Sequence, residues 1–242
     1  MRLCRKMKKI LLIILVLGFA QWWWFRDQTI HVPSHDITFS YIVKHAGRSS
    51  RNDHLPMLIA LHGNGDTVGN FYETALDEFI IPARIVLIKG PMSQGRGNAW
   101  SWRSDGFFNT YGEALSEAVS SLVLEYPTAG KPVLLGFSGG ATMAYYQAVK
   151  HGNSYSYIFP ISGTLSTKEF GSGASKTGAK VFAFHGTKDQ VIAISGGKTA
   201  EKILQDNGVT VKFTEFDGGH HGIYTNMKSK ITHAVEQKMR SL

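Results

Sequence analysis

Cysteine is almost absent from this 242-residue chain: Cys4 is the only one, and it precedes an apolar run near the N-terminus. The rest of the chain therefore has no thiol that could form a disulfide bond or act as a nucleophile. Internal repeats and extended low-complexity tracts are also missing, which excludes solenoid and propeller architectures. Because 43% of the residues are hydrophobic, the chain is predicted to be globular with a substantial core.

Acidic residues are missing from the first nine positions, which hold five of the basic residues: Arg2, Arg5, Lys6, Lys8 and Lys9. These five account for most of the net charge of +8, and the remaining Lys and Arg residues are scattered. Proteins that bind nucleic acid usually cluster their basic residues on one face. We therefore expect no nucleic-acid partner.

The basic N-terminus is followed by the apolar run ILLIILVLGFA at residues 10–20, an order typical of a secretory signal. Gly18 and Ala20 fit the small-residue positions of a cleavage site after Ala20. The aromatic residues 22–25 lengthen the apolar stretch, as in a membrane anchor, although a bilayer span needs about 20 residues. We expect export to the periplasm or the exterior, with residues 1–25 either cleaved as a signal peptide or retained as an anchor, and residues 26–242 forming one domain.

Beyond residue 30, β-rich apolar runs alternate with amphipathic segments. Strands are predicted at residues 37–43, 56–63, 83–90, 132–138, 155–162, 180–186 and 209–216. Helices are predicted at residues 67–79, 111–126, 139–151, 196–207 and 227–240. This alternation predicts an α/β fold in which a mostly parallel sheet carries helices on both faces, with the first strand as an antiparallel edge. Ligands of such sheets bind beyond the carboxyl ends of the strands.

Ser138 stands between a predicted strand and a predicted helix in the segment PVLLGFSGGATM at residues 132–143. A nucleophile in such a sharp turn takes a strained backbone conformation, and side chains beside it would collide, which accounts for Gly136, Gly139 and Gly140. The turn exposes the serine Oγ above the sheet and directs the N–H of Gly139 toward a developing oxyanion. The alternative is a glycine-rich loop with an incidental serine.

A serine nucleophile needs a base, and the base needs a carboxylate that fixes its tautomer. Two later strand ends supply these groups. Asp189 follows the predicted strand at 180–186, and His220 and His221 follow the one at 209–216. The sequence therefore predicts that a serine, an aspartate and a histidine meet at the carboxyl edge of the sheet.

Four segments resemble motifs of the α/β-hydrolases in the phospholipase, carboxylesterase, thioesterase and dienelactone-hydrolase-like group: LHGNGD (61–66), GFSGG (136–140), FHGTKDQVI (184–192) and FDGGHHGI (216–223). The resemblance implies an α/β-hydrolase fold with Ser138 as nucleophile and Asp189 as orienting acid. It also implies that the N–H groups of Asn64 and Gly139 donate to the oxyanion. Such a mechanism needs no metal or organic cofactor.

Either of the two adjacent histidines could be the base. The usual spelling in the resembled group (aromatic, any, Gly, any, any, His) selects His221, whereas some relatives place the base directly after a glycine run, which selects His220. We predict His221 as the base and His220 as a residue that packs beside it. A metal site on the histidine pair is disfavoured, because the sequence offers no third ligand at a recognisable spacing.

Several other polar residues near these motifs are interpreted as structural. In the resembled group, histidine–glycine pairs such as those at His62 and His185 shape the oxyanion and acid loops. Asp66 is typical of a turn or helix cap, and Asp217 is too close to the histidines in sequence to support one. Lys188 is interpreted as a solvated neighbour of Asp189.

The long segment 90–108 carries the aromatic residues Trp100, Trp102, Phe107 and Phe108. In the resembled group this loop lines the substrate pocket, which predicts an apolar, aromatic site; alternatively, these side chains pack the loop onto the core. Residues 163–179 leave no room for a large lid domain. A site without a lid suits small or extended acyl substrates.

Together these features predict an exported serine hydrolase that cleaves ester or thioester bonds of small molecules through an acyl-enzyme on Ser138. Two alternatives are a serine peptidase and a binding protein without turnover. GHHGI also resembles the base region of prolyl-oligopeptidase catalytic domains, but the chain has no propeller or large N-terminal domain. The presence of all three triad residue types argues against a binding protein without turnover.

Overall fold

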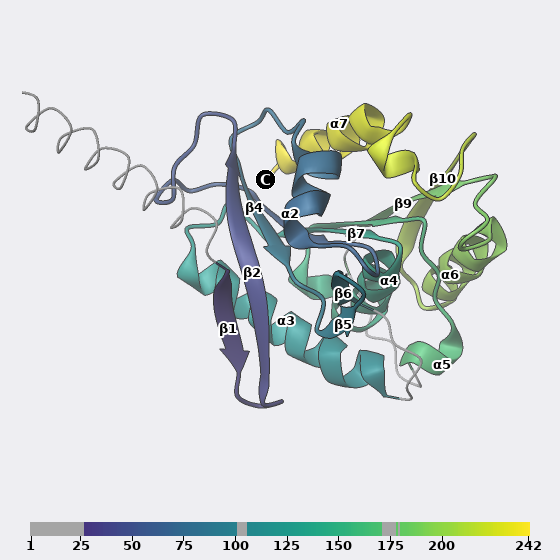
Figure 1. Cartoon of the computed structure of the whole chain (residues 1–242), viewed down its shortest axis with the longest axis horizontal. Coiled ribbons are helices and arrows are strands. Elements are labelled where there is room, and N and C mark those ends of the chain that lie inside the picture. Colours follow the sequence, from purple (N-terminus) through teal and green to yellow (C-terminus); the bar gives the residue numbers. More distant parts are fainter. Residues whose placement is uncertain (1–26, 101–105, 171–177, 179) are drawn as a thin grey trace, which may run out of the picture.

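The computed structural model describes residues 27–100, 106–170, 178 and 180–242. Its centre is an eight-stranded sheet with the strand order β1-β2-β4-β3-β7-β8-β9-β10 (Figure 1). The strands are β1 (Gln28–Val32), β2 (Ile37–Ala46), β3 (Met57–Leu61), β4 (Ala83–Ile88), β7 (Val133–Phe137), β8 (Tyr157–Ile161), β9 (Lys180–Gly186) and β10 (Thr210–Phe216). The pairs β1-β2 and β2-β4 are antiparallel, and the other neighbours are parallel.

Helices cover both faces of this sheet, and a short hairpin stands beside it. The α-helices are α2 (Val68–Phe71), α3 (Phe107–Glu125), α4 (Gly139–His151), α5 (Thr167–Phe170), α6 (Ile194–Asp206) and α7 (Lys228–Met239). A π-helical turn, η1 (Tyr72–Leu76), continues α2, and η2 (Gly152–Ser154) and η3 (Gly222–Tyr224) are 3₁₀ helices. The hairpin consists of β5 (Met92–Gln94) and β6 (Gly97–Ala99).

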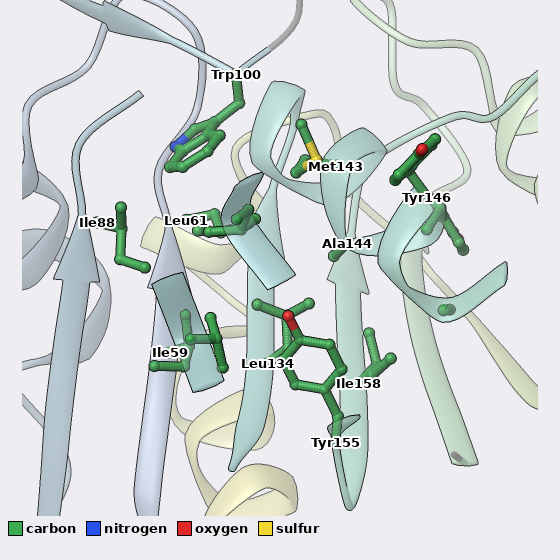
Figure 2. Close-up of a cluster of buried hydrophobic side chains, with 14 of the residues drawn as sticks. Ile59, Leu61, Ile88, Trp100, Leu134, Met143, Ala144, Tyr146, Tyr155 and Ile158 are labelled. Carbon is green, nitrogen blue, oxygen red and sulfur yellow. The ribbon is translucent and has the colours of Figure 1, made fainter. Parts of the chain in front are cut away.

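The side chains of the strands divide between two hydrophobic cores, one on each face. In β3, Met57, Ile59 and Leu61 belong to the core that contains residues of α3, α4 and α6, whereas Leu58 and Ala60 belong to the core under α2, η1 and α7. Figure 2 shows part of the first core, where the strand side chains meet those of α4. Because both faces are covered, the strand has to be apolar throughout, and this explains the continuous apolar run in the sequence.

The predicted α/β class and mostly parallel sheet are confirmed, since each predicted strand and helix overlaps an element of the structure. The first predicted strand, β2, is antiparallel as expected, but the prediction that it forms the sheet edge is wrong. β1 occupies that edge and pairs with β2 from Gln28↔Tyr41 to Val32↔Ile37. This five-residue strand is half polar, so its sequence gives only a weak strand signal.

The predicted signal or anchor at residues 1–25 lies outside the described residues. Within the ranges that the structure describes, no helix is long and apolar enough to cross a membrane.

Candidate active site

Ser138 occupies the sharp turn between β7 and α4. Its backbone has φ 54° and ψ −115°, a conformation rare for a non-glycine residue. The turn closes only because two glycines allow close backbone approach: a Cβ on Gly136 would collide with the carbonyl of Gly140, and a Cβ on Gly140 would collide with the carbonyl of Leu61. The Ser138 N–H donates to the carbonyl of Ile161, so the turn is also tied to the end of β8.

Hydrogen bonds join Ser138, His220 and Asp189 in one chain. Ser138 Oγ lies 2.9 Å from His220 Nε2, and His220 Nδ1 lies 2.8 Å from Asp189 Oδ2. Because an ionised carboxylate only accepts hydrogen bonds, the neutral ring carries its proton on Nδ1 and accepts from the serine hydroxyl at Nε2. In this arrangement a histidine can take the proton of a serine as the serine attacks.

Asp189 is buried and held by several donors. Its Oδ1 accepts from the N–H groups of Val191 and Ile192, at 2.9 Å each. Its Oδ2 accepts from His220 and also lies 3.3 Å from Nε2 of His185. The His185 ring is fully buried, and the same Nε2 lies 2.8 Å from the carbonyl oxygen of Ile192. These contacts fix the orientation of the carboxylate. The sequence reasoning treated His185 as a loop residue and missed its contact with Asp189.

Burial lowers the pKa of His220 below its ordinary value of 6.5. The hydrogen bond and the negative charge of Asp189 oppose this shift, whereas the neighbouring His221 and His185 lower the pKa further. His220 is therefore neutral near pH 7, as a proton acceptor must be.

The prediction that His221 is the residue bonded to Ser138 is wrong, because His220 occupies that place. After β10, the N–H groups of Thr187 and Lys188 donate to the carbonyls of Phe216 and Gly218, so the two loops continue side by side. This pairing brings His220 against Asp189, whereas His221 starts the 3₁₀ turn η3 and stays exposed. The alternative spacing, with the base directly after a glycine run, is the one that agrees with His220.

The two predicted oxyanion donors, Asn64 and Gly139, lie next to each other beside Ser138. Gly139 is the first residue of α4, so its N–H has no acceptor within the helix. A Cβ on Gly139 would collide with the side chain of Asn64, which shows how closely the two loops approach. Both residues line the cavity into which Ser138 opens.

The hairpin β5–β6, which sequence reasoning missed, supports the loop that carries Asn64. The N–H of Gly65 donates to the carbonyl of Asn98 at 2.8 Å, and the N–H of Asn98 donates to the carbonyl of Asp66 at 2.9 Å. The backbone N–H of Trp100 donates to Asn64 Oδ1 at 2.9 Å. These bonds fix the position of Asn64 relative to Ser138.

The expectation of an aromatic substrate pocket is wrong for the three described aromatic residues of segment 90–108. Trp100, Phe107 and Phe108 are buried in the core that contains residues of α3 and α4, and Figure 2 shows Trp100 in this core. The Trp100 ring stacks on Phe39. The alternative reading, that these side chains pack the loop down, is the one that the structure supports. Trp102 lies outside the described residues.

The remaining polar residues of the motifs have structural contacts. Buried His62 lies with Nδ1 2.7 Å from the carbonyl of Gly63 and accepts at Nε2 from the N–H of Gly90; burial lowers its pKa. Asp66 Oδ1 accepts from the N–H of Thr67 and from Asn70 Nδ2, as expected of a turn and cap residue.

Asp217 and Lys188 pair with each other in solvent, since their side chains are 78% and 71% exposed. Asp217 therefore gives no support to the histidines. Among the described residues, no group of three or more His, Cys, Asp and Glu side chains is arranged to hold a metal ion.

Ser138, His220 and His221 line an open cavity of about 900 Å³. Its walls come from the loop after β3, the hairpin, the loop after β9 and the turn η3. The loop after β3 is also joined to η3, because the hydroxyl of Tyr224 donates to Asp66 Oδ2 at 3.2 Å. The cavity lies at the carboxyl edge of the sheet, where the sequence placed the site.

A family model described as phospholipase/carboxylesterase matches residues 44–238 of this chain. The carboxylesterase of Bacillus cereus is similar in structure, with a TM-score of 0.66, 17% identity, and coverage of 84% of this chain and 95% of its own. The carboxylesterase of Mesorhizobium loti has a TM-score of 0.67, 16% identity, and coverage of 86% and 98%. Esterase PE8 has a TM-score of 0.61, 22% identity, and coverage of 80% and 99%. At these identities, the likeness to solved structures shows the fold alone. A comparison with curated protein sequences gave no match.

Proposed function

Because this chain belongs to the phospholipase/carboxylesterase family of α/β-hydrolases, which act on esters, we propose that it cleaves carboxylic esters through an acyl-enzyme on Ser138. The observation that carries this proposal is the continuous hydrogen-bonded chain from Ser138 Oγ through His220 to Asp189. A serine hydroxyl becomes a useful nucleophile when a neutral histidine of fixed tautomer accepts its proton. Thioesters of similar shape would react by the same steps.

The reaction proceeds in two halves. Ser138 Oγ attacks the carbonyl carbon while His220 Nε2 takes the hydroxyl proton, and the carbonyl oxygen becomes an oxyanion. His220 then gives this proton to the leaving oxygen as the ester bond breaks, which releases the alcohol. A water molecule repeats the sequence on the acyl-enzyme, and the acid leaves with Ser138 restored.

Two groups stabilise the charges that develop in these steps. Asp189 keeps the Nδ1 proton in place and balances the positive charge that His220 gains. The N–H groups of Asn64 and Gly139 donate to the oxyanion, and the positive end of α4 adds to this effect. The proposal for these donors is supported by their position against each other and against Ser138.

The test compares the full chain with Ser138→Ala and, as a matched control, Ser120→Ala, an exposed position on α3. We expect the full chain and the control to hydrolyse p-nitrophenyl butyrate and to be labelled by a fluorophosphonate probe. Ser138→Ala should lose labelling and at least a thousandfold of kcat/KM. Turnover that survives in Ser138→Ala, or an unlabelled parent chain, would exclude the acyl-enzyme on this serine.

We also propose that residues 1–25 direct the chain to a membrane and across it, on the strength of the basic and apolar pattern of that segment. Cell fractionation of the full chain and of a chain lacking residues 2–25 tests this. We expect only the full chain in the periplasmic or membrane fraction, and N-terminal sequencing distinguishes cleavage after Ala20 from a retained anchor. Equal retention of both chains in the cytosol would contradict export.

A further inference from the structure

The topology places two different walls on opposite sides of Ser138. Ser138 directly follows β7, and in the sheet β3 and β4 lie on one side of β7, whereas β8 and β9 lie on the other. The loop after β3 and the hairpin after β4 therefore form one wall of the cavity, and the loops after β8 and β9 form the opposite one. An ester bound at Ser138 has two substituents on its carbonyl carbon, and each can lie against one wall.

The wall on the β3 side is polar. Besides Asn64 and the glycines beside it, the wall includes Asp66, Asn70, Thr74 and Gln94. Asp66 is already occupied by the hydroxyl of Tyr224 and the Nδ2 of Asn70. Gln94 is exposed, and its side-chain amide makes no hydrogen bond to any residue that the structure describes. Because an amide offers both donors and an acceptor, this wall suits a group that carries hydroxyls.

The opposite wall presents the aliphatic side chains of Val191 and Ile192, beside Thr164, whose hydroxyl donates to the carbonyl of Gly196. Val191, which is 66% exposed, and Ile192 lie two and three positions after Asp189, and their N–H groups donate to its Oδ1. These bonds fix the two side chains at the rim of the cavity, beside the Asp189–His220 pair. Two side chains cover a group of only a few carbon atoms, so a long acyl chain would extend beyond them into water.

The charge of the cavity favours a neutral substrate. None of the described residues that line it is a lysine or an arginine, and Asp66 contributes a carboxylate. A phosphate or carboxylate on the substrate would meet this negative charge, and no lysine or arginine among the described lining residues would balance it.

Resting on the proposed ester hydrolysis, we infer that the preferred substrate is a neutral ester with a short aliphatic group on one side of the carbonyl and a hydroxyl-bearing group on the other. The aliphatic group lies against Val191 and Ile192, and the hydroxyls bind Gln94 and Asn70. Such esters include short-chain acyl esters of polyols and short alkyl esters of hydroxy acids.

The experiment compares kcat/KM of the full chain for three esters of similar size: glyceryl monobutyrate, butyl 2,3-dihydroxypropanoate and butyl butyrate. We expect one of the two hydroxylated esters to exceed butyl butyrate at least tenfold, since two hydrogen bonds are gained. The hydroxylated ester that is preferred shows which wall binds the alcohol part of the substrate and which binds the acyl part. If kcat/KM for butyl butyrate equals that for both hydroxylated esters, the inferred substrate class is overturned, while the proposed ester hydrolysis still holds. If the fluorophosphonate probe does not label Ser138, the proposed ester hydrolysis and the inferred substrate class both fail.

Two variants connect this preference to the walls. Gln94→Leu should lower the preference for the hydroxylated ester over butyl butyrate about three- to tenfold, mainly through KM. Val191→Asn should lower kcat/KM for both the preferred ester and butyl butyrate. The matched control is Gln205→Leu, an exposed glutamine on α6 outside the cavity, which should leave the ratio unchanged. An unchanged ratio in Gln94→Leu would overturn the assignment.

Discussion

Asp189 Oδ2 faces two histidines, yet only His220 also reaches Ser138. His185 is locked behind the carboxylate by the carbonyl of Ile192. The adjacent His221 is exposed and meets His220 edge to face, with ring centroids 5.2 Å apart. The three rings therefore have different consequences for the proposed reaction, although His185 and His221 both lie close to His220.

Single substitutions of His220 and His221 by alanine distinguish the roles of the two residues. His220→Ala should lower kcat/KM for p-nitrophenyl butyrate at least a thousandfold, because Ser138 loses its proton acceptor. His221→Ala should stay within about tenfold of the parent chain, because it makes no bond to the serine. The reverse ranking of the two variants would assign the base to His221.

The pH dependence of kcat/KM reports on His220, whose neutral form is the active one. Activity should rise with pH through the pKa of this ring, and because burial lowers that pKa, the midpoint should lie below 6.5. Asp189, His185 and His221 are the titratable groups that face the ring. His221→Gln removes a neighbour that lowers the pKa, so the midpoint should move upward. A parent midpoint at or above 7 would contradict this assignment.

Residue identities alone placed Ser138 and Asp189 at the edge of the sheet, because strand ends and glycine patterns are local. The choice between His220 and His221 depends on how the loop after β10 pairs with the loop after β9. That pairing is a tertiary contact. If the loop after β10 were shifted by one residue, His221 would face Asp189 in place of His220. Local spacing could not decide between the two histidines.

At the scale of elements, the packing of α4 against the sheet sets the position of the nucleophile. The close approach is made at Gly140, where α4 passes the end of β3. Gly69 in α2 is a useful contrast, since a Cβ there would meet no atom within 4 Å.

Gly140→Ala should lower the free energy of unfolding by about 1–3 kcal/mol, because the added methyl group forces α4 away from the carbonyl of Leu61. Activity should fall with it, since Ser138 moves. Gly69→Ala should be neutral or stabilising by up to about 1 kcal/mol, as expected of alanine in an open helical position. Urea unfolding measures both, and equal effects would contradict the proposed clash.

A second element contact joins α7 to the loop before β4. Buried Glu236 accepts from the N–H groups of Ile80 and Ile81, at 2.6 and 3.1 Å. Glu236→Ala should lower the free energy of unfolding by about 1–3 kcal/mol, because both N–H groups lose their acceptor. Glu236→Gln keeps an amide oxygen and should lose less. Equal losses in urea unfolding would show that the acceptor does not matter.

The hairpin β5–β6 shows why some elements escape prediction. Its strands are three residues long, too short for a recognisable alternation, and its function is to hold Asn64 through backbone bonds. By contrast, the predicted strands β3 and β4 are apolar runs that are buried at every position. Burial on both faces leaves a signal in sequence, whereas backbone support of a loop does not.

At the scale of the molecule, burial of neutral histidines makes stability depend on pH. Burial lowers the pKa of His45, His62 and His220 below 6.5. Between 6.5 and these lower values, the unfolded chain binds more protons than the native one, so stability falls as pH falls through this window. The urea midpoint should therefore decrease from pH 7 to pH 5. A midpoint that is constant or rises over this range would contradict these shifts.

The whole-molecule prediction from sequence succeeded where composition and alternation decide, namely the α/β class and the single sheet. It left open whether the aromatic residues of segment 90–108 line the substrate pocket or fill the core, because such side chains look the same in sequence in both cases. Trp100 illustrates this: its backbone N–H supports Asn64, while its ring is buried.

Helix α4 is buried from Gly139 to Val149, and its first residue adjoins Ser138. Any loosening of the interior therefore reaches the reactive oxygen directly, without passing through a surface loop. Heat inactivation and the melting of the core should then coincide in temperature, since a molten interior has no means of keeping the serine turn closed.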